Sequence, residues 1–429
     1  MIVDILIWIG QNIFRQPVIL LGLVALIVLL LQKKPVDEVV IGTAKVMIGF
    51  TMMIVGITFF VQELVNFQKL MYTALSIAPK YLPGHISLDK VIADYGSYAV
   101  AIMTIAFIIH LLIARFTKLK FVYLTGHLMW WVSLTVTATL LTINPNISSV
   151  LLIGIGSIIM ALYWSLQPAY IHKAMRDLMG SDEVAYGHTS SLVAWLAYKL
   201  GKHVGRPEEG TEAITLPKSL SFFKDYATST VIILGLVMVI SVTIGYTLNP
   251  SAVSQLAGSM NPVIWTLLSS VRFAVSIVVI LTGVRMFIAE IMPAFREFAI
   301  KIVPGVRLAL DCPTVFSQAP TAVIIGFISG LIVFLMFMGI FIATGFAVIV
   351  PSMITLFFPG GAAAVFGNRS GGWKGAILGG VMNGLILAVG QAITLPALTY
   401  GSELAILADP DWYVIIWLLK GILGPILGR

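Results

Sequence analysis

Two polar residues of this sequence interrupt long apolar runs, where an ionisable group is costly and by default marks a site or a pathway. His127 follows Thr125 and Gly126, and the glycine breaks a helix at the start of an apolar stretch. Broken backbone at membrane depth is tolerated where it lines a cavity, although a histidine could also cap a helix at a membrane surface. Asp311 precedes Cys312 and Pro313, and the proline prevents a continuous helix.

The Asp311 carboxylate can accept two hydroxyl groups of one polar solute. The alternative role is an N-cap for the helix that follows, which aspartate often fills. His188, in Tyr186-Gly187-His188-Thr189, lies in a polar stretch, and its context alone favours an ordinary histidine on the cytoplasmic surface. Their sequence surroundings therefore make His127 and Asp311 candidate solute-binding residues. The surroundings of His188 do not decide whether it binds a solute.

Other polar residues in apolar stretches favour structural roles. Arg285 and Glu290 are five residues apart, so they do not share a helix face and are expected to tie neighbouring helices together. His110 and Gln391 are expected to be hydrogen-bonded between helices. The sequence contains no P-loop, nucleotide-binding fingerprint or HExxH motif, so an ATP-driven pump with its own motor is not expected.

Composition places these residues in a membrane protein. Of 429 residues, 59% are hydrophobic and 10% are charged, with a mean hydropathy of +1.01. Soluble domains have about 25% charged residues and about 45–50% apolar ones. The apolar runs are continuous rather than alternating, which favours helices over a β-barrel.

Eleven stretches are long and apolar enough to cross a bilayer, which takes about 20 residues each. They lie at roughly 15–31, 39–63, 95–115, 121–143, 147–166, 228–247, 263–290, 317–337, 341–363, 375–398 and 411–427. The chain is therefore predicted to be an all-α polytopic membrane protein with eleven transmembrane helices. The boundary between the eighth and ninth is poorly marked, because 321–350 is one apolar run.

The loops between these stretches orient them, because cytoplasmic loops carry an excess of lysine and arginine. Basic loops follow the first, third, fifth and seventh stretches and precede the tenth. They share one side if the N-terminus is outside and the C-terminal Arg429 is inside. The opposite side then carries the acidic Glu403, Asp409 and Asp411, and the lysine-containing loop 66–94 is the exception.

The net charge of +7 thus follows membrane topology rather than a nucleic-acid-binding patch. The longest polar stretch, 172–225, has helical spacing over 188–204 and is predicted to be an amphipathic cytoplasmic insert in a single membrane domain, 1–429. The lone Cys312 excludes an intrachain disulfide and a four-thiolate metal site. No cofactor, metal site or cleavable signal peptide is expected.

An internal duplication is indicated by residues 54–64 and 281–291. They share a glycine, a phenylalanine four residues on and a glutamate seven residues on: Gly56, Phe60 and Glu63 against Gly283, Phe287 and Glu290. A second pair, 124–127 and 358–361, follows at a similar offset. The matched segments are five spans apart, so the second copy is inverted, as in many transporters. The repeats are predicted at about 15–166 and 228–427.

Several of these motifs together resemble the ascorbate-type enzyme IIC of the bacterial phosphotransferase system. They are Leu124-Thr125-Gly126-His127, Tyr186-Gly187-His188, Gly283-Val284-Arg285-Met286-Phe287-Ile288-Ala289-Glu290, Asp311-Cys312, and Phe366-Gly367-Asn368 with Gly371-Gly372-Trp373. The similarity runs in order from the Lys33-Lys34 loop to about residue 390.

This resemblance implies a homodimeric permease of the bacterial inner membrane with eleven spans. Its solute is L-ascorbate, which a cytoplasmic enzyme IIB, supplied by a IIA protein, phosphorylates, so the chain is not an enzyme on its own. The resemblance implies that His127, His188 and Asp311 contact the solute.

Two positions depart from the ascorbate pattern, which has glutamine four residues after the first histidine and another directly after the second. Here these positions hold Trp131 and Thr189, which we include among the candidate solute-binding residues. Tryptophan would replace amide hydrogen bonds by a stacking face, so the solute could be a related sugar acid or a polyol. The stretch 84–95 is also shorter than in the ascorbate pattern.

Two other functions fit the residues without the resemblance. An inverted repeat equally suits an ion-coupled secondary transporter of a small polar solute. A membrane-embedded enzyme acting on lipid, with histidine and aspartate as an acid–base pair, is a third reading.

Overall fold

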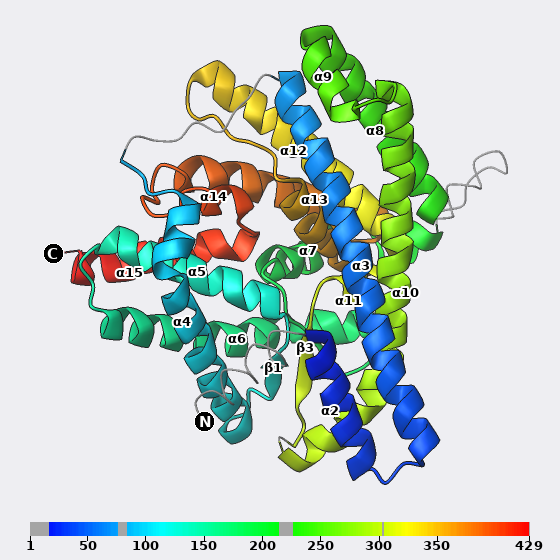
Figure 1. Ribbon diagram of the computed structural model, residues 1–429, viewed down its shortest axis with the longest axis vertical. Coiled ribbons are helices and arrows are strands. Elements are labelled where there is room, and N and C mark those ends of the chain that lie inside the picture. Colours follow the sequence, from blue (N-terminus) through cyan, green and yellow to red (C-terminus); the bar gives the residue numbers. More distant parts are fainter. Residues whose placement is uncertain (1–16, 76–83, 214–225, 303, 429) are drawn as a thin grey trace.

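The computed structural model describes residues 17–75, 84–213, 226–302 and 304–428 (Figure 1). The longer helices are α2 (Pro17–Leu31), α3 (Val36–Leu75), α4 (Leu88–Phe116), α5 (Gly126–Ile143), α6 (Ser149–Met179), α7 (Ser191–Val204), α8 (Tyr226–Leu248), α10 (Pro262–Ile302), α12 (Pro320–Thr344), α13 (Met353–Thr394) and α15 (Pro410–Leu427). Shorter helices are η2 (Pro207–Glu209), η3 (Thr211–Ala213), α9 (Pro250–Ala257), α11 (Pro313–Phe316) and α14 (Leu404–Leu407). The strands are β1 (Phe121–Tyr123), β2 (Val184–Tyr186) and β3 (Arg307–Leu310).

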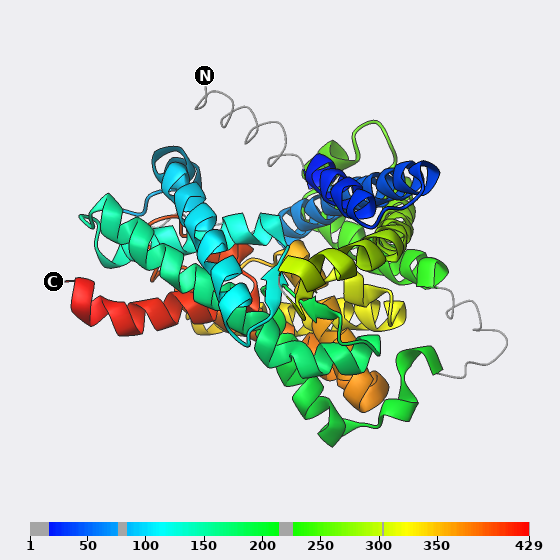
Figure 2. The same cartoon turned by 90° about the horizontal axis from the view of Figure 1, so that it is seen from below.

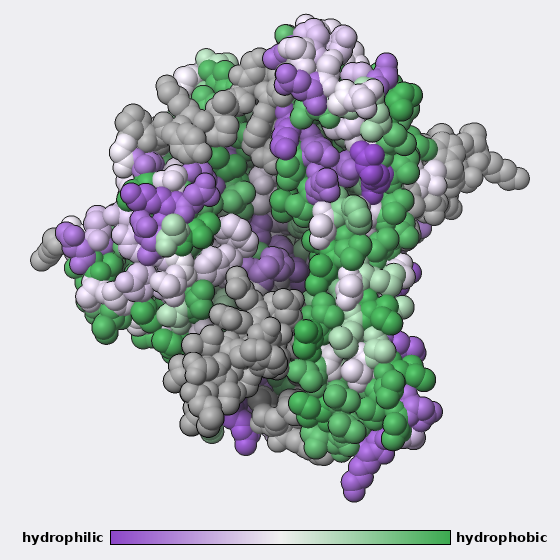
Figure 3. All heavy atoms as spheres, viewed as in Figure 1, coloured by the Kyte–Doolittle hydropathy of each residue, from purple (hydrophilic) through white to green (hydrophobic). Residues whose placement is uncertain are grey.

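The prediction of a helical, multi-pass membrane protein is confirmed. Within the described residues, eight helices are long and apolar enough to cross a membrane. Many large apolar side chains point outward, including Phe59 and Ile108, which are more than half exposed. Figure 3 shows broad apolar surfaces of this kind, which suit a lipid environment. The count of eleven spans and the inverted repeat stay predictions.

Two predicted boundaries are wrong. The expected fourth span, 121–143, begins with strand β1, and its helix α5 starts only at Gly126. The expected ninth span, 341–363, starts inside α12, which continues to Thr344, and the next helix begins only at Met353. Gly345 ends α12 in the left-handed conformation (φ 68°), and the segment before Met353 includes Pro351 and is not helical. The residues between are themselves apolar, so hydropathy did not mark the break.

Helix α13 is a hairpin of two antiparallel arms. Gly371 and Gly372 interrupt it, and Gly372 has φ 60° and ψ −154°, a conformation that essentially only glycine adopts. A side chain at Gly367 would overlap the backbone carbonyl of Gly375, and the reverse also holds. The two arms therefore touch through their backbones.

The helices form two groups with a shared middle (Figures 1 and 2). On one side α3 packs against α2, α8 and α10, and on the other α4 packs against α5 and α6, with α15 against α5. α7, α12 and the α13 hairpin pack together between them. The Phe60 ring on α3 lies 4.3 Å from the rings of both Phe273 on α10 and Phe357 on α13, which joins the first group to the middle.

A small parallel sheet, which the sequence did not predict, lies at this centre. Its order is β1-β3-β2, so the last strand in the chain is the middle one. Val122 of β1 and Val184 of β2 both align with Leu308 of β3. All three residues are buried.

Candidate functional site

The three candidate residues of the sequence follow directly after the three strands. β1 leads through Leu124 and Thr125 to the start of α5 and His127, β2 leads to His188, and β3 leads to Asp311. Because the carboxyl ends of parallel strands meet at one edge of a sheet, segments far apart in the chain are brought together there. The sheet is thus the element that assembles the site.

Hydrogen bonds beyond the sheet hold these strand ends together. The Leu124 N–H donates to the Ala309 carbonyl (3.1 Å), and the Gly187 N–H donates to the Leu310 carbonyl (2.8 Å). The Thr125 hydroxyl donates to the Gly187 carbonyl. Gly187 has to be glycine, because a Cβ there would lie 2.6 Å from the Ala309 carbonyl oxygen. The strand ends therefore cannot separate without breaking several backbone contacts.

Asp311 stands between the two histidines. One carboxylate oxygen lies 3.8 Å from Nε2 of His127, and the other lies 3.7 Å from Nε2 of His188. The His127 side chain is 60% exposed, whereas that of His188 is 4% exposed. His127 thus forms the open side of the cluster and His188 its inner wall.

The hydrogen bonds of His188 assign its tautomer. The Ser190 N–H donates to Nδ1 of His188 (3.1 Å), so Nδ1 is an acceptor and the ring hydrogen lies on Nε2. Burial lowers the pKa of His188 to about 4, which keeps the ring neutral at pH 7. The Nε2–H donor and the Asp311 acceptor stand side by side at the site.

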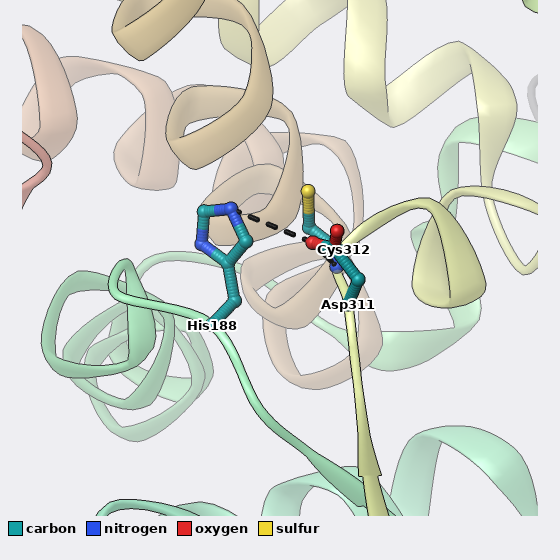
Figure 4. A group of neighbouring side chains, drawn as sticks. All are labelled: His188, Asp311 and Cys312. Carbon is teal, nitrogen blue, oxygen red and sulfur yellow. Dashed lines mark hydrogen bonds and ion pairs between the residues drawn. The ribbon is translucent and has the colours of Figure 1, made fainter. Parts of the chain in front are cut away.

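Cys312 completes this cluster (Figure 4). Its N–H donates to Asp311 (2.6 Å), and polar atoms of His188, Asp311 and Cys312 lie within 4.8 Å of one another. Imidazole, carboxylate and thiolate groups are also ligands of zinc. Because Asp311 accepts the backbone N–H of Cys312 and lies close to both histidines, we interpret the group as one site for a polar solute.

The other two candidates, Trp131 and Thr189, are close to the two histidines along the chain. Trp131 is half-buried on α5, one helical turn after His127. Thr189 is buried, and its hydroxyl donates to Asp409.

Two buried carboxylates that sequence reasoning had placed on the outer surface lie behind His188. Asp409 immediately precedes α15 and Asp411 lies in its first turn. A carboxylate oxygen of Asp409 lies 3.9 Å from Nδ1 of His188, and the Asp411 carboxylate accepts the Leu192 N–H. The only sequence signal was the pair of aspartates flanking Pro410, which is also an ordinary helix start.

Other polar residues of the apolar stretches connect elements of the fold rather than line the site. As predicted, His110 on α4 is hydrogen-bonded to Ser165 on α6 (2.8 Å). Gln391 instead pairs with the backbone of Val350, in the non-helical segment before α13. Arg285 is exposed on α10, and the side chain of Glu290 lies outside the described residues. Among the described residues, Glu63 and Arg272 form an ion pair between α3 and α10 (2.5 Å), a pairing that the sequence did not predict.

Comparison with known proteins identifies the family of the chain. Residues 12–411 match the family described as the sugar-specific permease component of the phosphotransferase system (PTS), and the chain belongs to that family. It is also similar to the "Ascorbate-specific PTS system EIIC component" of Mycoplasma pneumoniae (strain ATCC 29342 / M129 / Subtype 1), at 27% identity over 418 residues. The match covers 86% of this chain and 63% of that relative, so the chain spans less than two thirds of the relative's length.

Proposed function

We propose that the chain is a phosphotransferase-system permease that binds and translocates L-ascorbate, or a related sugar acid or polyol. The side-by-side donor and acceptor formed by His188 Nε2–H and the Asp311 carboxylate, 3.7 Å apart, carries this proposal. Such a pair complements a solute with neighbouring oxygens, one accepting and one donating a hydrogen bond. The name of the M. pneumoniae relative supports ascorbate as the first solute to test.

The chemistry of L-ascorbate suits these groups. Its ring oxygens carry delocalised negative charge and accept hydrogen bonds, while its side-chain hydroxyls donate them. His188 and His127 would face the ring oxygens, and Asp311 would accept from a hydroxyl. Trp131, one turn along α5 from His127, would offer an aromatic face to the solute.

The position of the site also supports transport. The charge pattern assigns the stretch around His188 to the cytoplasmic side and the segment around Asp409 to the opposite side. Nδ1 of His188 nevertheless lies 3.9 Å from Asp409, and under the assigned topology the two segments would meet between the membrane faces. A midplane site reached from both sides is what alternating access requires.

The assembly we propose follows the family. The chain would sit in the bacterial inner membrane as a homodimer, with the N-terminus outside and the C-terminus in the cytoplasm. A phosphorylated enzyme IIB would modify the solute on the cytoplasmic side, and the chain itself would supply binding and passage.

Direct binding tests the proposal. Purified protein in detergent is titrated with radiolabelled L-ascorbate and with a panel of sugar acids and polyols. We expect saturable binding of at least one of them, strongly weakened in Asp311→Asn. Vesicles should accumulate that solute only when phosphorylated IIB is supplied inside. Uptake driven by an ion gradient without IIB would instead establish a secondary transporter.

A further inference from the structure

Thr189 and Asp409 form a hydrogen-bonded pair directly behind His188. The Thr189 hydroxyl donates to the Asp409 carboxylate, and both residues are at least nine-tenths buried. Asp409 precedes α15, but within the described part of the chain its side chain caps no backbone N–H of that helix. Its carboxylate is directed at the His188 turn instead.

Asp411 holds the same turn from the other end. Its carboxylate accepts hydrogen bonds from the Ser191 hydroxyl (2.5 Å), the Leu192 N–H (3.0 Å) and the Tyr163 hydroxyl (2.8 Å). The first two donors belong to the first turn of α7, so Asp411 caps α7 from a different helix. The Asp411 N–H in turn donates to the Thr189 carbonyl (3.0 Å).

These contacts fix the residues that follow His188, between β2 and the first turn of α7. His188 follows β2, and three residues later α7 begins. Asp409 holds Thr189 on one side of the turn. Asp411 holds Ser191 and Leu192 on the other side. Ser190, between them, is thereby placed so that its N–H donates to Nδ1 of His188. The direction of the His188 Nε2–H therefore depends on residues more than two hundred positions further along the chain.

We propose that Asp409 and Asp411 are positioning residues that, with Thr189, orient His188 toward the solute, and that Thr189 does not itself contact the solute. That His188 faces a solute rests on the proposed function. That these residues fix the orientation of the His188 ring does not. The Thr189 hydroxyl is already donated to the Asp409 carboxylate.

The reactivity of His188 toward diethyl pyrocarbonate tests the proposal without a solute. The reagent attacks a neutral imidazole nitrogen, and in the wild-type protein Nδ1 is bound to the Ser190 N–H and the ring is buried. Thr189→Val keeps the side-chain shape but removes the hydroxyl, and Asp411→Asn removes the charge. We expect each to raise the rate of His188 modification by about tenfold, near the upper end of the range for one lost hydrogen bond.

Three controls make the result specific. His127, which is largely exposed, is modified in the same sample and should keep its rate. Thr189→Ser retains the hydroxyl and should behave as wild type. Thr137→Val removes another buried hydroxyl, which donates to the Ser133 carbonyl within α5, and should leave His188 unchanged.

A double variant decides whether the pair acts as a unit. The double variant Thr189→Val, Asp409→Asn should raise the rate of His188 modification no more than the more reactive of the two single variants does. The reason is that both substitutions remove the same interaction. Unchanged His188 rates in Thr189→Val and Asp411→Asn, or equal rises in Thr189→Val and Thr189→Ser, would overturn the proposal. Loss of solute binding in Thr189→Val at an unchanged His188 rate would make Thr189 a direct ligand. If the wild type binds no solute of the panel, the proposed function fails, while the His188 rates still decide the positioning role.

Discussion

Gly56 on α3 and Gly283 on α10 lie at reciprocal positions of one helix crossing. A Cβ on Gly56 would lie 2.8 Å from the backbone nitrogen of Ile280 and 3.0 Å from the Ser276 carbonyl oxygen. A Cβ on Gly283 would lie 2.5 Å from the backbone nitrogen of Met53 and 2.6 Å from the Gly49 carbonyl oxygen. Shifted by the 227 residues that separate the two glycines, Gly49 and Met53 become Ser276 and Ile280.

This reciprocity supports the proposed inverted duplication. The contacts pair increasing numbers on α3 with decreasing numbers on α10, so the two helices run antiparallel, and the Glu63–Arg272 ion pair continues the same register. The same shift moves α3, Val36–Leu75, onto 263–302, against the observed Pro262–Ile302 of α10. It moves the start of α5 from Gly126 onto Met353, the first residue of α13. The second sequence match, 124–127 with 358–361, has a different offset and falls inside α13.

Alanine at either glycine should destabilise the protein to a similar extent. Each added methyl group would press on the facing backbone, and overpacking of this kind costs about 1–3 kcal/mol. Thermal unfolding of Gly56→Ala and Gly283→Ala in detergent measures the effect. Gly154→Ala on α6 is the matched control, because a Cβ there meets no atom within 4 Å. A wild-type melting temperature for one of the two variants would speak against a reciprocal crossing.

Asp311→Asn should weaken solute binding by about 10- to 100-fold, since a hydrogen bond to a charged group contributes about 1.5–3 kcal/mol. Asparagine keeps an oxygen that can accept the Cys312 N–H, so the fold should be retained. Equilibrium binding and the melting temperature are measured on the same samples, with the exposed Asp89→Asn on α4 as control. Wild-type affinity in the Asp311 variant would exclude Asp311 as a ligand.

Substitutions of His188 can test its tautomer. Glutamine places an amide N–H near the position of Nε2, whereas asparagine reaches only the position of Nδ1. His188→Gln should therefore bind the solute about tenfold more tightly than His188→Asn, the difference that one retained hydrogen bond makes. Isothermal titration of the two variants measures this ratio. Equal losses in both would show that the Nε2–H is not the group that contacts the solute.

The membrane orientation can be tested by labelling single cysteines in a Cys312→Ala background. Lys69→Cys, at an exposed position near the end of α3, should react with an impermeant thiol reagent added outside. Position 296 is the counterpart of position 69 after the 227-residue shift, and Arg296→Cys should react only after the membrane is permeabilised. Labelling of both from the same side would contradict the inverted duplication and the assigned topology together.

Much of the fold could be predicted because transmembrane helices are marked by hydropathy alone. Each of the eleven predicted stretches overlaps a helix, although 341–363 and 375–398 both overlap α13, and the misplaced boundary of 341–363 lies where the chain stays apolar through the break before Met353. The sheet was missed because strands of three or four residues have no detectable alternation. His127 and Asp311 could be proposed from local motifs. Asp409 could not, since its partner Thr189 is 220 residues away and only the folded chain brings them together.

The strand order has a consequence for how the protein is made. β1 and β2 do not pair with each other, and both pair with β3, which begins only at Arg307. A nascent chain that has inserted everything up to α8 therefore carries two strands with no partner. The binding site cannot assemble during synthesis until most of the chain has left the ribosome, and long-range pairing of this kind is slow. A first half expressed by itself would hold both histidines but no site, until a separately expressed second half supplied β3.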